Sequence, residues 1–362
     1  MLDILATELL LQIFQSCNSI ADVLNLSLTC RRLHGIFSGS QKLTILANAA
    51  EIEYGPLEDI IQLITQNSSQ PAHIHRDAPL SLSLIQQVVE VGRVAKKWEE
   101  IYPIKKWKVD FENRRMLDAH ERLLLRRAAY RHWLYSRAFH CQLFPRTSRT
   151  QPSAVHERAQ LLHNWSTSEL AEIEDFRLVM REVVQNQICP SNETIQRKFK
   201  KRYPESTPSF HNFHLNHPSP TPSTPFSILN SQAYASSSID NHHFRNLTPR
   251  NSSAVNKYAT KFRSDLYHEP GTEGWGDQIH HYYVVEDMMK LDPSQVLLLR
   301  EHAPFKEQVE SYVHSLGDWF ENNGETFGQT LEWVMSERGG DYMDLHFAIV
   351  DGEAGIAKME ES

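Results

Sequence analysis

Apolar positions at helical spacing dominate the ordered parts of this chain. Near the N-terminus they predict one helix from about Thr7 to Ser16, with Thr7 as its N-cap, and a second helix capped by Asp22. The apolar positions that define the two helices are Leu9, Leu10, Ile13, Phe14, Val23, Leu24, Leu26, Leu28 and Leu33. The segment 1–46 is therefore expected to form two or three short helices.

The same periodicity continues beyond this segment and predicts a mainly α-helical protein. The further expected helices cover about 59–65, 80–98, 113–143, 167–187, 304–321 and 325–338. Residues 206–256 are instead rich in Ser, Pro, Asn and His, a composition that buries too little apolar surface to offset chain entropy. We expect a helical body at 47–205, a disordered insertion at 206–256, a helical C-terminal region at 257–345 and a fraying acidic tail at 346–362.

Composition and charge narrow the function classes. The chain has 362 residues, 40% of them hydrophobic, and a formal charge of −8, which argues against broad affinity for nucleic acid or anionic membranes. Its four cysteines are widely spaced, which fits neither a disulfide framework nor a zinc site. No apolar stretch is long enough for a membrane span, and a signal peptide is not expected. These features favour the cytosol or the nucleus.

The N-terminal pattern resembles the F-box family. Leu5-Ala-Thr-Glu-Leu-Leu-Leu-Gln-Ile-Phe14 matches the family's opening Leu-Pro-x-Glu-Leu-Leu-x-x-Ile, and Asp22-Val-Leu-Asn-Leu-Ser-Leu-Thr-Cys-Arg-Arg-Leu33 takes the place of its later Asp-Leu-x-x-Leu-x-x-Val-Cys-Lys/Arg-x-Trp. Ala6, Thr29 and Leu33 stand where the family usually has Pro, Val and Trp. The resemblance covers the first 45 or so residues.

This resemblance implies a non-catalytic substrate receptor of an SCF-type ubiquitin ligase, which binds a Skp adaptor carried by a cullin scaffold and acts without a cofactor. Two short amphipathic helices also cannot bury all their apolar faces against each other, so an apolar surface is expected to remain for a partner to cover. The residues expected to contact the adaptor are Leu5, Glu8, Leu9, Leu10, Ile13, Phe14, Leu24, Leu26, Leu28, Cys30 and Leu33.

Three further segments, 121–135, 274–285 and 315–327, look like parts of fungal F-box proteins of unassigned target. The C-terminal region is also dense in aromatic residues. These residues form either a hydrophobic core or, in part, an open surface that binds a protein target. The residues proposed for target binding are Trp275, Tyr282, Tyr283, Trp319 and Phe320.

An arginine-rich stretch at 113–143 raises an alternative function. Arg126, Arg127 and Arg131 belong to a helix with interleaved aromatic residues, which could bind nucleic acid or an acidic, phosphorylated target. The plainer interpretation is a solvated basic face over a core stripe, with local pairs to Asp118 and Glu121. A basic run at 197–202 could serve nuclear import.

The sequence shows no recognisable enzyme or metal motif. GxSxG, Walker-type and GxGxxG motifs are absent. Histidines cluster at 211–217, 242–243 and 280–281, but no ligand spacing recurs, so no metal site is predicted. An unrecognised helical enzyme remains a third hypothesis, which requires a pocket with converging polar groups.

Overall fold

The computed structural model describes residues 5–67, 69–110, 114–202, 274–276, 279–320 and 324–358. These residues confirm a mainly α fold: they form helices, and their only β-type pairing is an isolated bridge between Ser191 and Trp275. The expected insertion at 206–256 lies outside the described residues.

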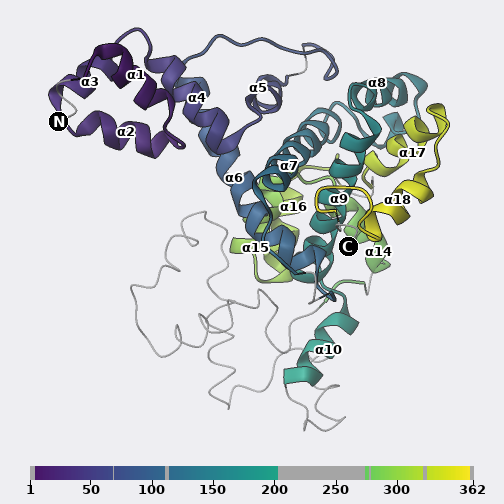
Figure 1. The fold of residues 1–362 in the computed structure, drawn as a ribbon. Coiled ribbons are helices and arrows are strands. Elements are labelled where there is room, and N and C mark those ends of the chain that lie inside the picture. The colour runs from purple at the N-terminus through teal and green to yellow at the C-terminus, as the bar shows by residue number, and fades with distance from the viewer. Residues whose placement is uncertain are drawn as a thin grey trace. The chain divides into compact units, whose positions relative to one another are not determined.

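Figure 1 shows the helices in chain order. Their bounds are α1 Thr7–Gln15, α2 Ile20–Leu28, α3 Arg31–Phe37, α4 Lys42–Tyr54, α5 Leu57–Thr65, α6 Leu82–Lys106, α7 Ala119–Phe139, η2 Arg146–Ser148, α8 Pro152–His163, α9 Thr167–Val183, η3 Val184–Ile188, α10 Asn192–Arg202, α14 His281–Met288, α15 Pro293–His302, α16 Lys306–Leu316, α17 Phe327–Glu337 and α18 Tyr342–Val350.

The first two helices begin slightly differently from their sequence-based prediction. Ala6, not Thr7, occupies the N-cap of α1, and its side chain makes no capping hydrogen bond. The cap of α2 is Ser19, whose hydroxyl accepts a hydrogen bond from the Asp22 backbone N–H at 3.0 Å. Asp22 therefore lies in the first turn, where its negative charge favours the helix N-terminus. A third short helix, α3, follows directly.

The helical body has two long helices, α6 and α7. Helix α6 is capped by Ser81 and runs past Pro103 to Lys106, well beyond the predicted end near residue 98. Helix α7 is shorter than predicted, because Asp118 and Glu121 form a capping box that starts it at Ala119 instead of near 113. Helices α4, α5, α6 and α7 pack against one another.

The end of the described chain is ordered, so the prediction of a fraying tail from residue 346 is wrong as far as Lys358. Helix α18 runs to Val350 and packs against α17. Beyond it, Ile356 and Ala357 are buried. The Ile356 backbone N–H donates to the Asp175 carboxylate at 3.0 Å, which anchors this segment.

The chain divides into two compact units, and each is described by itself. Unit 1 comprises the described residues of Met1–Met180, Lys290–Ser294 and Glu325–Ser362, and includes α1 to α8, α17 and α18. Unit 2 comprises those of Arg181–Met289 and Gln295–Gly324, and includes η3, α10, α14 and α16.

Candidate functional site

The helices α1 to α3 pack on α4 around a small apolar core (Figure 1). We call α1 to α3 the N-terminal subdomain. Phe14 of α1 stacks on Phe37 of α3, with ring centroids 5.9 Å apart. Leu10, Val23 and Leu33 are buried with them. Because α1 and α2 both direct one face into this core, their opposite faces are left toward solvent.

Three leucines of this subdomain remain exposed. Leu28 is 77% exposed, Leu9 47% and Leu24 44%. Leu24 and Leu28 lie one turn apart on α2 and therefore share a face, while Leu9 lies on α1. We call Leu9, Leu24 and Leu28 the exposed leucines. They are apolar side chains that the described part of the chain leaves open to a partner.

The other residues predicted to contact the adaptor fall into three groups by their exposure. The first group, buried in the core, stabilises the packing of the subdomain and does not form its surface: Leu10, Phe14 and Leu33. Glu8 is exposed in the first turn of α1. The half-buried members, which pack against the core and keep part of their surface open, are Leu5, Ile13, Leu26 and Cys30.

Glu53 of α4 fixes α2 to the body, a role that the sequence pattern did not reveal. Its carboxylate accepts the Ile20 backbone N–H at 3.0 Å and the Lys96 ammonium at 2.6 Å. Its backbone carbonyl accepts a hydrogen bond from Arg126 at 2.9 Å. Burial acts to raise the pKa of Glu53, but the hydrogen bonds from Lys96 and Ile20 outweigh it and lower the pKa.

The residues proposed for target binding all lie in Unit 2, where they differ in exposure. Tyr282 and Tyr283 are exposed at the start of α14, and their rings meet edge to face. Trp275 is half-buried, with the Lys306 ammonium 5.4 Å from its ring centroid. Trp319 is half-buried and donates its ring N–H to the Leu316 carbonyl, whereas Phe320 is buried. Phe320 is therefore a core residue.

The arginine-rich helix α7 is paired with acids of Unit 1. Arg126 contacts Glu99 at 2.8 Å, and Arg127 contacts Glu172 at 2.7 Å. Arg131 lies between two carboxylates, Asp59 at 2.9 Å and Glu169 at 2.6 Å. The acids that pair with these three arginines come from α5, α6 and α9, not from α7 itself. Glu121 of α7 pairs instead with Arg115, which precedes the helix. These arginines hold helices together.

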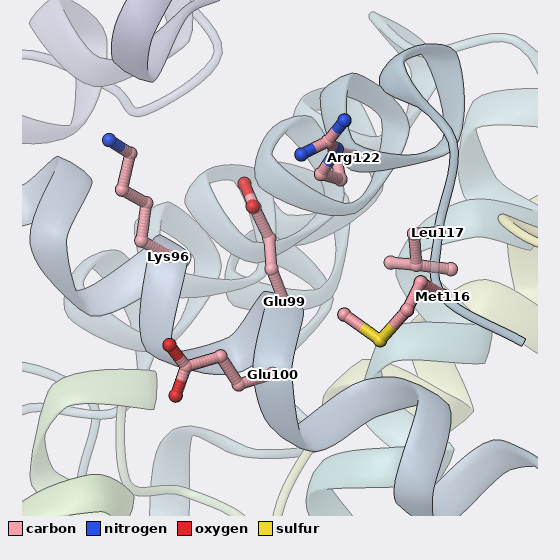
Figure 2. A pocket seen from close by; sticks show the side chains of 6 residues that line it. All are labelled: Lys96, Glu99, Glu100, Met116, Leu117 and Arg122. Carbon is pink, nitrogen blue, oxygen red and sulfur yellow. The ribbon is translucent and has the colours of Figure 1, made fainter.

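A pocket of about 380 Å³ opens between α6 and the start of α7 (Figure 2). Figure 2 shows Glu99 extending between Lys96 and Arg122, with Glu100 pointing away from it. Lys96 and Glu99 already have partners, in Glu53 and Arg126. Met116 and Leu117 complete the lining, which contains no Ser, Cys or His. A lining that carries both charge signs, half of them already paired, selects no single class of ligand.

Neither histidine of the 280–281 pair is arranged as a metal ligand. His280 caps α14 by accepting the Tyr282 backbone N–H at 3.2 Å, and His281 lies 2.6 Å from the Cys189 carbonyl oxygen. Within the described ranges, no group of three or more His, Cys, Asp or Glu side chains could hold a metal ion. The other histidine clusters, at 211–217 and 242–243, lie outside those ranges.

In the part of the chain that the structure describes, no helix has both the length and the apolar character of a membrane span. Comparison with family models, with curated proteins and with solved structures gives no match to this chain.

Proposed function

We propose that this chain is the substrate receptor of an SCF-type ubiquitin ligase. In this proposal the N-terminal subdomain binds a Skp adaptor, which a cullin scaffold carries, and the remainder binds a protein target for ubiquitin-dependent degradation in the cytosol or nucleus. The chain supplies no reacting group. It raises the local concentration of the target beside the ubiquitin-conjugating enzyme, and this proximity is its contribution to catalysis.

The exposed leucines are the observation that carries this proposal. A core of Leu10, Phe14 and Leu33 holds α1 to α3 in a fixed arrangement, while Leu28 keeps most of its surface in water. Covering the Leu28 side chain in an interface would contribute about 2 kcal/mol. A rigid helix pair with apolar side chains facing outward suits the helix-in-groove type of protein recognition.

The proposed target surface is the exposed part of the aromatic group in Unit 2. Tyr282 and Tyr283 offer large rings with polar tips, a residue type enriched at the centre of protein interfaces. Arg181 lies over the Tyr282 ring at 5.6 Å and pairs with Glu286 at 2.6 Å, which holds that ring in place. Trp275 adds a half-buried ring of the same unit.

The nucleic-acid alternative gains no support from the structure. It requires arginines of α7 that are available to phosphates. Arg127 and Arg131 instead bind acids of α5 and α9, and Arg126 binds Glu99 of α6. Opening these pairs would leave carboxylates such as Asp59 without a counter-ion, which costs free energy.

Affinity capture of the full-length tagged chain tests the proposal. Co-purified Skp adaptor and cullin are quantified for the natural chain and for the Leu24→Asp, Leu28→Asp double variant. The proposal expects the natural chain to retain both proteins and the variant to lose them. Leu80→Asp is the matched control, because Leu80 is similarly exposed but lies outside the N-terminal subdomain. Capture that is absent from the natural chain, or equal in the variant, would contradict the proposal.

A further inference from the structure

Helix α18 presents an apolar stripe to solvent. Met343 is 48% exposed, Phe347 57% and Val350 60%. Their spacing of four and then three residues places all three side chains on one face of the helix. On the far side of the helix Ile349 is fully buried. We call Met343, Phe347 and Val350 the α18 stripe. The stripe lies outside the N-terminal subdomain.

The helix that carries the stripe is held firmly by its other face. Asp341 caps it by accepting the Met343 backbone N–H at 2.7 Å. The Tyr342 hydroxyl donates to Glu174 at 3.1 Å, and the Lys106 ammonium donates to the Ile349 carbonyl at 2.9 Å. Both ends of α18 are therefore tied to other helices of Unit 1, α9 and α6. The exposure of the stripe is a property of an ordered helix.

Acidic residues border the stripe on one side. Asp344 and Asp351 are both exposed, and because they are seven residues apart they lie along the same edge of the helix, next to Phe347. Exposed Glu353 follows just beyond the helix. No Lys or Arg occurs from Asp341 to Glu353. The surface thus combines three apolar anchors with a purely negative edge.

We propose that the α18 stripe docks a basic amphipathic helix of a partner protein. Apolar side chains of that helix, one turn apart, would cover Met343, Phe347 and Val350, while its Lys or Arg residues face Asp344 and Asp351. The proposal does not depend on adaptor binding, because the two surfaces share no residue.

The negative edge disfavours the other possible occupants. In a two-fold dimer of this chain the same patch meets itself, so Asp344 and Asp351 would face the equivalent carboxylates of the second copy. An anionic membrane surface would repel the same edge, since interfacial helices carry Lys and Arg on their polar side. A positively charged helix is the partner that matches both the stripe and its edge.

Fluorescence anisotropy with two designed peptides tests this proposal on the full-length chain. One labelled helical peptide of about 18 residues carries Leu at positions i, i+4 and i+7 with Lys along one flank, and its counterpart has Glu in place of Lys. The Lys peptide is expected to bind about tenfold more tightly than the Glu peptide. Phe347→Ser is expected to weaken Lys-peptide binding about tenfold. The Asp344→Lys, Asp351→Lys double variant is expected to reverse the preference between the peptides.

Two control variants make the outcome specific. Val109→Ser removes an exposed apolar side chain outside α18, and Asp77→Lys reverses an exposed charge outside α18. Both are expected to bind the Lys peptide like the natural chain. The proposal is overturned if neither peptide binds or both bind equally, or if Phe347→Ser has no effect. It is also overturned if the stripe instead mediates binding to anionic vesicles or self-association, measured by flotation and by sedimentation.

Discussion

The backbone N–H of Ile20 donates a hydrogen bond to the carboxylate of Glu53 at 3.0 Å, across 33 residues of sequence. Ile20 is the first residue of α2, the helix that presents Leu24 and Leu28, and Glu53 lies in the last turn of α4. This bond satisfies one of the backbone donors left open at the start of a helix. It therefore fixes Leu24 and Leu28 relative to α4.

Replacing Glu53 tests this link through its pH dependence. Glu53→Gln removes the charge that pairs with Lys96 at 2.6 Å, and is expected to cost about 1 kcal/mol of unfolding free energy near neutral pH. Since the folded state lowers the pKa of Glu53 below its ordinary value of 4.5, its stabilisation is full above pH 4.5 and is lost as the pH falls through the lower folded-state pKa. The difference in unfolding free energy between the natural chain and Glu53→Gln should therefore shrink below pH 4.5.

Urea unfolding at pH 7 and at a pH below 4.5 measures this effect. Glu100→Gln is the control, because Glu100 is an exposed glutamate of α6. A deficit of Glu53→Gln that stays constant or grows toward low pH would show that the carboxylate charge is not the stabilising group.

Truncating a core residue of the N-terminal subdomain should lower the free energy of unfolding strongly, whereas truncating an exposed leucine should change it little. Phe14→Ala removes a fully buried ring that stacks on Phe37, and is expected to cost about 3–5 kcal/mol. Leu28→Ala removes a side chain that is mostly in water, so its effect on the isolated chain should be within about 0.5 kcal/mol. Chemical denaturation of both variants measures the difference. Equal losses would mean that Leu28 is already covered by this chain.

Arg131 should behave as a structural residue. Arg131→Gln leaves Asp59 and Glu169 without their shared counter-ion, and is expected to destabilise Unit 1 by about 3 kcal/mol. Arg122→Gln, at an exposed position of the same helix, should change stability little. Thermal unfolding compares the two, and a salt-dependent DNA or RNA titration of the natural chain accompanies it. Tight, steeply salt-dependent binding that Arg131→Gln abolishes without loss of stability would favour the nucleic-acid alternative.

Asp175 is expected to hold the C-terminal segment in place. Its buried carboxylate accepts hydrogen bonds from the Tyr102 hydroxyl at 2.5 Å, the Lys106 ammonium at 2.8 Å and the Ile356 backbone N–H at 3.0 Å. Asp175→Asn leaves the largely buried Lys106 unpaired, so a loss of about 3 kcal/mol is expected. Faster amide hydrogen exchange at Ile356 should accompany the loss of stability.

A substitution at Gly355 tests the same hydrogen bond between Ile356 and Asp175. Gly355 has φ of +103°, and a Cβ there would lie 2.6 Å from the Asp175 carboxylate, so Gly355→Ala should also increase exchange at Ile356. Asp351→Asn, at an exposed position of the same segment, serves as the control. Unchanged protection of Ile356 in both Asp175→Asn and Gly355→Ala would rule out this anchoring role.

Local patterns were sufficient to predict the fold class and most helices. The apolar spacing around Leu10 and Phe14 predicted a helix that the structure contains as α1. Helix ends were predicted less well, because they depend on capping: Ser19 takes the role expected of Asp22, and the Asp118–Glu121 capping box delays the start of α7. These are local contacts, but several nearby residues could have made them.

Long-range partners could not be predicted from one sequence. The sequence shows that Leu10, Leu24 and Leu28 are apolar residues at helical spacing. Only the packing of α1 to α4 determines that Leu10 is buried and Leu28 exposed. The arginines of α7 were expected to face solvent or to pair within the helix, and most of their acids come from other helices. The order of the C-terminal segment likewise depends on Asp175, 181 residues before Ile356.

Calorimetric titration of the purified full-length chain with purified Skp adaptor tests the central claim most directly. The account predicts one-to-one binding with a negative heat-capacity change, since apolar surface is buried. Binding should be lost in Leu24→Asp, Leu28→Asp and retained in Leu80→Asp. If the folded natural chain binds no adaptor, or if the double variant binds as tightly as the natural chain, the exposed leucines are not an adaptor-binding surface.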